Sequence, residues 1–214
     1  MNGEQALHIL YQDRWIVVVE KPGGLLAVPG RGPGKQDSVA ARVRHLVPWC
    51  IEQPAVHRLD MDTSGLMVLA LTAEVHRHLS QQFAERRVEK GYLALLEGMV
   101  AGETGEVRLP FRLDPTNRPY QVYDPIQGKM GVSGWRRVEV RGGRTLVAFT
   151  PETGRTHQLR LHASHPLGLG CPIVGDRLYG SGQPGDRLML HATWLQFEHP
   201  ATGQRMAFAS APSF

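Results

Sequence analysis

The sequence GLMVLAL at residues 65–71 contains no polar side chain, and an amphipathic stretch follows it directly. Seven consecutive apolar residues predict a strand that is buried on both faces. In the stretch that follows, Val75, Leu79 and Phe83 recur every fourth residue, which predicts a helix with one buried stripe. The polar side chains between them, Gln82 included, are expected to face solvent.

Further strands and helices are expected on both sides of this pair. The β-branched run WIVVV at 15–19 ends at KPGG, residues 21–24, and predicts a buried strand before a sharp turn. Ser38 is expected to cap a helix that ends near Leu46, and Gly142-Gly143 to join two strands as a hairpin. The remaining expected elements are a short helix after Thr156 and extended segments at 25–28, 92–96, 135–140, 145–149, 188–197 and 206–209. Strands separated by both hairpins and helices predict an α+β fold with a mixed, largely antiparallel central sheet and flanking helices.

The chain has 214 residues, of which 42% are hydrophobic, enough for one large domain or for two lobes that share a sheet. No apolar run approaches the ~18–20 residues that a membrane span needs, and the first residues, MNGEQ, do not resemble a signal peptide. The two cysteines, Cys50 and Cys171, lie far apart and form no CxxC pair. We therefore expect a single domain over residues 1–214 in a reducing, cytoplasmic setting.

The basic side chains, nearly all arginine, give the chain a net charge of +4 at pH 7, and their excess lies in residues 108–214. Arginine suits bidentate phosphate contacts and stacking on bases, so this half is a candidate RNA surface. The alternative is that these arginines are solvated strand ends. The arginines concerned are Arg112, Arg118, Arg136, Arg137, Arg141 and Arg144.

The densest polar cluster is HRLDMDTSG, residues 57–65, at the start of the apolar strand. One interpretation is a simple turn in which Asp60 or Asp62 accepts backbone hydrogen bonds. The other is a catalytic loop in which Asp60 acts as nucleophile or general base. Asp60 and Asp62 also fit the loose DxD pattern of metal-dependent transfer enzymes, although no third carboxylate follows nearby.

A second cluster is GRTHQLRLH, residues 154–162. On a helix, His157 and Arg160 can share a face, whereas His157 and His162 are badly spaced to hold zinc. The alternatives are ordinary hydrogen-bonded packing for the histidines and an exposed helix charge for Arg160. Tyr92, taken alone, is typical of a core or cross-strand aromatic residue.

The ordered motifs resemble the RluA family of pseudouridine synthases. The resemblance rests on HRLD at 57–60 with TSG at 63–65, KGY at 90–92 and the cluster at 154–162. KPGGL at 21–25 and GDRLYG at 175–180 add to it, and the resemblance runs from about Leu10 to the C-terminus. It implies the pseudouridine synthase catalytic fold and an isomerase that converts a uridine in RNA to pseudouridine with no cofactor and no metal.

The resemblance also implies residue roles. Asp60 would act at the ribose of a flipped-out uridine, and Arg160 would pair with Asp60. Tyr92 would stack on the uracil and act as, or help to position, the base that takes the proton from its C5. Arg58 would fill the gap that the flipped nucleotide leaves. The other residues expected to bind substrate are His57, Asn117, Arg118, Arg155 and His157.

Within the family, segments such as those around Leu10 and Asn117 resemble members that modify a ribosomal RNA hairpin and a tRNA anticodon stem-loop. No accessory RNA-binding domain is expected, and the chain is expected to act as a monomer. Two rival hypotheses are a metal-dependent glycosyl or phosphoryl transfer enzyme that uses Asp60 and Asp62, and a non-catalytic RNA-binding module.

Overall fold

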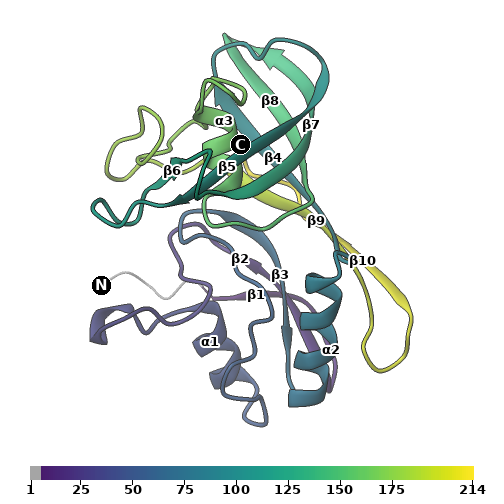
Figure 1. Ribbon diagram of the computed structural model, residues 1–214. Helices are drawn as coiled ribbons and strands as arrows, with labels where there is room; N and C mark the ends of the chain where they lie inside the picture. The colour runs from purple at the N-terminus through teal and green to yellow at the C-terminus, as the bar shows by residue number, and fades with distance from the viewer. Residues whose placement is uncertain (1–5) are drawn as a thin grey trace. The chain divides into compact units, whose positions relative to one another are not determined.

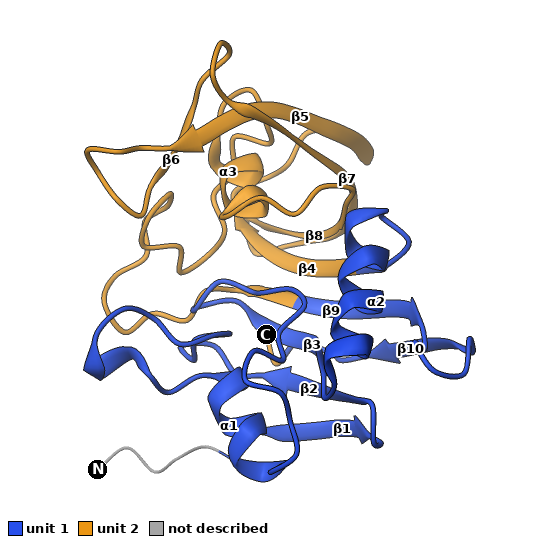
Figure 2. Ribbon diagram, turned by 60° about the horizontal axis from the view of Figure 1, so that its bottom comes forward, with its two compact units in different colours: residues 1–90, 192–212 blue, residues 91–191, 213–214 orange. Residues whose placement is uncertain are grey.

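The computed structural model describes residues 6–214, so the N-terminal MNGEQ segment, where no signal peptide was expected, lies outside the described residues. The chain divides into two compact units (Figure 2). Unit 1 contains the residues up to 90 together with 192–212, and unit 2 contains 91–191 with 213–214. No helix among the described residues is long and apolar enough to cross a membrane.

Unit 1 is a sheet with two helices, α1 and α2 (Figure 1). Its strands follow the order β1-β2-β3-β9, with β10 paired to β9, and the pairings β1–β2, β2–β3 and β9–β10 are antiparallel. The elements are β1 (His8–Gln12), β2 (Ile16–Lys21), α1 (Val39–Leu46), β3 (Ser64–Ala70), α2 (Ala73–Ala84), β9 (Leu190–Glu198) and β10 (Arg205–Ala209), with a short 3₁₀ turn η1 (Pro33–Lys35) before α1.

The predicted core strand and the helix after it are confirmed. Every residue of β3 is buried, and Val75 and Leu79 of α2 pack in one cluster with Ile16 and Val18 of β2. The side chain of Thr72 caps α2 by accepting a hydrogen bond from the Val75 backbone N–H (3.3 Å). Burial of apolar surface on both faces of β2 and β3 therefore gives unit 1 its core.

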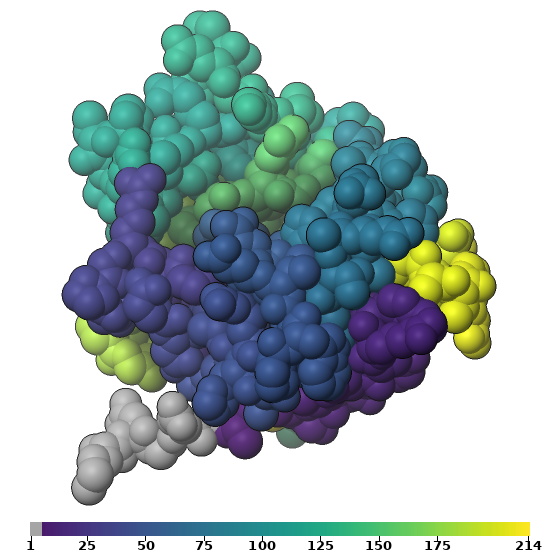
Figure 3. Space-filling model, turned by 90° about the horizontal axis from the view of Figure 1, so that it is seen from below, coloured from purple at the N-terminus to yellow at the C-terminus, as the bar shows by residue number. Residues whose placement is uncertain are grey.

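Two expectations for unit 1 are wrong. Gln82 is buried rather than exposed, because its side chain pairs with both backbone groups of Glu198: it donates to the carbonyl (2.7 Å) and accepts from the N–H (3.0 Å). In Figure 3 the β9–β10 end of the chain, in yellow, lies beside the teal and purple surface of unit 1. Residues 25–28 form no strand and make only one bridge, Leu26 to Ser38.

Unit 2 is an antiparallel sheet around one short helix, in the order β4-β8-β7-β5-β6. The helix, α3, is buried from Gln158 to Ala163, and the sheet curves around it (Figure 1). Leu159 and Ala163 pack with residues of β4 and β8, whereas Leu161 packs with β5. The elements are β4 (Glu89–Glu97), β5 (Thr104–Leu113), β6 (Gln121–Tyr123), β7 (Lys129–Arg141), β8 (Arg144–Pro151) and α3 (Gln158–Ser164).

The α+β class is confirmed, and so are the strands near 92–96, 135–140 and 145–149 and the hairpin at Gly142-Gly143. Three of the strands in residues 6–214 were not predicted from the sequence. They are β1, β5 and β6.

Candidate functional site

The predicted site residues fall in both units, and the part in unit 1 is the segment 57–63 that leads into β3. The segment ends in a tight turn in which the Thr63 N–H donates to the Asp60 carbonyl (3.2 Å). Asp60 is half-buried and Arg58 is exposed. A turn is therefore present, closed by the backbone carbonyl of Asp60, and capping of this turn by the Asp60 or Asp62 carboxylate stays a prediction.

The buried side chain of Lys21 holds the backbone of this turn by hydrogen bonds. Its side chain is fully buried at the end of β2, and its Nζ donates to the carbonyls of Pro22 (2.9 Å), Leu25 (2.7 Å) and Met61 (2.7 Å). The Gly24 N–H donates to the same Met61 carbonyl (2.9 Å). The KPGG motif is thus the clamp that fixes the backbone next to Asp60.

The electrostatics of Lys21 link it to the carboxylates of the turn. Burial lowers the pKa of Lys21 to about 7, while the charges of Asp62 and Asp60 oppose that shift. Its three carbonyl acceptors match the three N–H groups of an ammonium. The motif resemblance includes this lysine but assigns it no role. The burial of its amine could not be predicted from the sequence, because residue type alone does not distinguish a buried lysine from an exposed one.

The side chain of His57 contacts other residues of unit 1. Its Nε2 accepts a hydrogen bond from the Val68 N–H (3.1 Å), and its ring stacks on Phe83 with centroids 4.5 Å apart. Burial, with a smaller contribution from the charge of Lys90, lowers the pKa of His57 to about 3. The ring is therefore neutral and ties the start of the Asp60 segment to β3, and its expected contact with RNA stays a prediction.

Unit 2 holds the other predicted residues. Tyr92 lies on β4, half-buried opposite Phe149 of β8, and packs against the core cluster there, as a cross-strand aromatic residue would. Asn117 and Arg118 are exposed in the turn between β5 and β6, where Asp114 Oδ1 accepts from the N–H groups of Thr116 (3.0 Å) and Asn117 (3.3 Å). Two predicted substrate contacts thus lie on a turn that is ordered by its own hydrogen bonds.

The start of α3 is built differently from a regular helix turn. His157 has a left-handed backbone (φ 55°) and precedes the helix, so the helical spacing assumed between His157 and Arg160 does not apply. Gln158 holds this end in place: its Nε2 donates to the Val132 carbonyl (3.0 Å) and to Ser133 Oγ (2.9 Å). Arg155, just before, is exposed.

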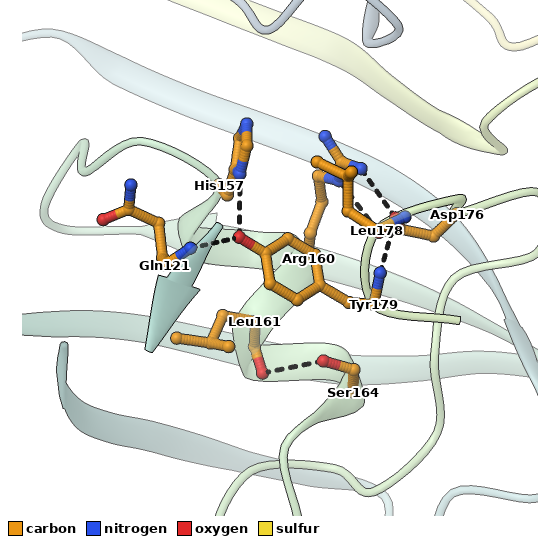
Figure 4. Close-up of polar contacts among 8 residues, drawn as sticks. All are labelled: Gln121, His157, Arg160, Leu161, Ser164, Asp176, Leu178 and Tyr179. Carbon is orange, nitrogen blue, oxygen red and sulfur yellow. Dashed lines mark hydrogen bonds and ion pairs between the residues drawn. The ribbon is translucent and has the colours of Figure 1, made fainter. Parts of the chain in front are cut away.

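Arg160 is not an exposed helix charge. Its side chain is 3% exposed, and its Nε and Nη2 donate to Asp176 Oδ2 (2.8 Å) and Oδ1 (2.6 Å). Figure 4 shows this pair beside Tyr179, whose hydroxyl accepts from the Gln121 N–H (2.8 Å) and is hydrogen-bonded to His157 Nδ1 (2.8 Å). Because Asp60 belongs to unit 1 and Arg160 to unit 2, the expected pairing of these two residues stays a prediction.

The arginines expected to contact RNA have mixed surroundings. Arg112 pairs with Asp124 (2.5 Å), and Arg137 lies 3.7 Å from Glu103 and donates to the Val100 carbonyl (3.4 Å). Others in the set, such as Arg118, are exposed. Within residues 6–214, no group of three or more His, Cys, Asp or Glu side chains is arranged to hold a metal ion.

The fold places the chain among pseudouridylate synthase domains. Human RNA pseudouridylate synthase domain containing 1 superposes with a TM-score of 0.77 at 28% identity, over 98% of this chain and 85% of that one. The human domain containing 4 protein superposes with a TM-score of 0.74 at 26% identity, over 96% and 88%.

The family itself is established by sequence, because the model of the RNA pseudouridylate synthase family matches residues 15–165. The chain belongs to this family, whose members are isomerases that act on RNA. It is 44% identical to the dual-specificity RNA pseudouridine synthase RluA of Haemophilus influenzae, over 99% of this chain and 95% of that protein. The RluA of Escherichia coli K12 is also 44% identical, with the same coverage.

Family membership supports the isomerase hypothesis and not the two rivals.

Proposed function

We propose that this chain converts a uridine in an RNA stem-loop to pseudouridine and that Asp60 is the catalytic carboxylate. The observation that carries the proposal is the Asp60 turn, in a chain of this family, with its backbone clamped by Lys21 and its start tied to β3 by His57. A carboxylate on such a rigid base can act at the ribose of an extruded nucleotide without reorganising.

The remaining roles follow the same proposal. Tyr92 stacks on the uracil and acts as, or helps to position, the base that takes the proton from its C5, and Arg160 pairs with Asp60. Arg58, which is exposed on the Asp60 segment, fills the space that the flipped nucleotide leaves. The further substrate contacts are His57, Asn117, Arg118, Arg155 and His157. The reaction is an isomerisation, so atoms and electrons balance without a cofactor.

We infer that the RNA is a ribosomal RNA hairpin, a tRNA anticodon stem-loop, or both. The support is the motif resemblance around residues 117–118 and the description of the two bacterial relatives as dual-specificity enzymes. In the same proposal, the two units form one catalytic domain that works as a monomer in the cytoplasm. The family match at residues 15–165 supports the single domain, because it draws on both units.

A panel of isolated stem-loops tests the substrate. Hairpins of ~15–20 nucleotides, with sequences taken from ribosomal RNA and from anticodon arms, are incubated with the full chain and mapped for pseudouridine by carbodiimide primer extension. We expect modification when the uridine lies in the loop and at least a hundredfold slower modification when it is moved into the stem, since flipping from a paired stem costs a few kcal/mol more. Modification of assembled ribosomal particles alone would contradict the proposal.

A further inference from the structure

Arg160 and Asp176 form a buried ion pair in unit 2. Both side chains are almost inaccessible to solvent, at 3% and 0% exposed. Buried ion pairs are often no more stabilising than apolar side chains of the same volume. A planar, two-pronged contact does, however, fix the orientation of the guanidinium.

Asp176 is itself held with its side chain fully engaged. Besides the guanidinium, Oδ1 accepts from the backbone N–H groups of Leu178 (2.9 Å) and Tyr179 (3.1 Å). Its backbone is fixed as well: the Asp176 N–H donates to the Ile173 carbonyl (3.0 Å), and its carbonyl accepts from Gly180 (3.1 Å). The carboxylate has little freedom to move, so it sets where the guanidinium lies.

The turn at Asp176 requires a glycine at the position before it. Gly175 has a φ of +76°, and a Cβ there would lie 2.0 Å from the Arg187 carbonyl oxygen. Only glycine fits such a close backbone approach. The GD pair of the GDRLYG motif thus combines a tight turn with a carboxylate that the turn aims at Arg160.

Tyr179 completes the arrangement (Figure 4). Its ring centre lies 5.4 Å from the Arg160 guanidinium carbon, and its hydroxyl joins Gln121, at the start of β6, to His157, at the start of α3. The turn that carries Asn117 and Arg118 is therefore tied to the same point as Arg160.

We propose that Asp176 is a positioning residue for the reaction: it fixes the direction of the Arg160 guanidinium, and Tyr179 holds the neighbouring turn and helix start in register with it. This inference rests on the proposed function, in which Arg160 acts on Asp60. Asp176 does not touch the substrate, so its loss should lower the rate of chemistry and leave RNA affinity unchanged.

The first test is Asp176→Asn. The asparagine amide has two orientations. In one its NH₂ group faces Arg160 Nε, and in the other it faces Arg160 Nη2 and the N–H groups of Leu178 and Tyr179. Both orientations bring donors together, so the two-pronged contact is lost. We expect the single-turnover rate on a stem-loop to fall at least tenfold while the Kd changes less than threefold. A rate within threefold of wild type would overturn the proposal.

The matched control is Asp37→Asn. Asp37 makes an equally bidentate pair with Arg42 (2.7 Å for both contacts), but at the surface of unit 1. Its rate and Kd should match wild type. If Asp176→Asn is folded by circular dichroism but loses RNA affinity to the same extent as rate, Asp176 does not act on the chemistry and the proposal fails.

A double-mutant cycle tests whether Asp176 acts through Arg160. Adding Asp176→Asn to Arg160→Met should cause no further loss of the residual rate. A further tenfold loss would show that Asp176 acts independently and would overturn the proposal.

Asp176→Glu covers the case in which the asparagine variant does not fold. It keeps the charge but moves the carboxylate by one methylene, and we expect a reduced rate with unchanged Kd. A wild-type rate would contradict the positioning role.

Failure of the two ideas is distinguishable. If wild-type protein forms no pseudouridine in any stem-loop or ribosomal RNA, the proposed function fails. If wild-type protein is active and the Asp176 variants are equally active, only the positioning role fails.

Discussion

Replacing His57 with glutamine should reverse the sign of its effect on stability between pH 7 and pH 5. In the folded protein the His57 ring accepts the Val68 N–H and is neutral, and burial lowers its pKa to about 3 from 6.5. In the unfolded chain the ring takes up a proton below pH 6.5. Folding stability therefore falls as the pH drops below 6.5, and the loss continues until about pH 3.

The magnitude follows from this pKa difference. Each pH unit in that window costs about 1.4 kcal/mol, so at pH 5 the wild type has lost about 2 kcal/mol through this one group. A glutamine Oε1 can accept the Val68 N–H in place of Nε2, but the variant loses the stacking on Phe83, worth about 1 kcal/mol. His57→Gln should be about 1 kcal/mol less stable than wild type at pH 7 and about 1 kcal/mol more stable at pH 5.

Urea unfolding at the two pH values measures both differences, and the other histidines cancel because every variant contains them. His57→Phe is the matched control: it keeps an aromatic ring on Phe83 but orphans the Val68 N–H, at a cost of about 1–3 kcal/mol at pH 7. If wild type and His57→Gln lose the same stability between pH 7 and pH 5, the ring is protonated in the fold and the reasoning is refuted.

Two further substitutions test other buried polar contacts. Gln82→Ala should lower the free energy of unfolding by about 2 kcal/mol, because both backbone groups of Glu198 lose their partner; a loss below about 0.5 kcal/mol in urea unfolding would contradict that pairing. Lys21→Met should abolish a pH effect: with a folded pKa near 7 against 10.5, the wild type gains stability as the pH rises from 7 towards 10.5, since only the unfolded chain still holds the proton. Unfolding curves at pH 7 and pH 9 should show this gain in wild type and not in the variant, and an equal gain in both would refute the assignment.

The apolar patterns were enough to predict the core of unit 1. Residues 65–71 and the stripe Val75, Leu79 formed the buried strand and helix as expected, because burial there depends only on side-chain type and spacing. The strand β5 was missed because Gly105 and Pro110 interrupt it, and only Val107, Leu109 and Phe111 face the core in alternation.

Polar residues were harder to predict, because their partners are distant in sequence. Gln82 lies seven residues after Val75 and three after Leu79, on the buried face of α2, but its polar side chain favoured exposure, and its partner Glu198 is 116 residues away. The sequence alone is compatible with an exposed helix charge at Arg160, but in the structure its guanidinium pairs with Asp176. Lys21 lies in a predicted turn motif, but its Nζ donates to the carbonyl of Met61, 40 residues away. The family resemblance identified the motifs, but the pairing of their side chains required the fold.

The most direct test of the account is the conversion of uridine by Asp60→Asn, compared with Asp62→Asn in the same turn. Pseudouridine in a stem-loop is measured by carbodiimide primer extension under single-turnover conditions, and RNA affinity is measured in parallel. We expect Asp60→Asn to form no detectable pseudouridine while its Kd stays within threefold of wild type, because phosphate and shape contacts supply most of the affinity. Asp62→Asn should keep its rate within tenfold. Turnover by Asp60→Asn within tenfold of wild type, or equal loss in both variants, would contradict the role of Asp60 as the catalytic carboxylate.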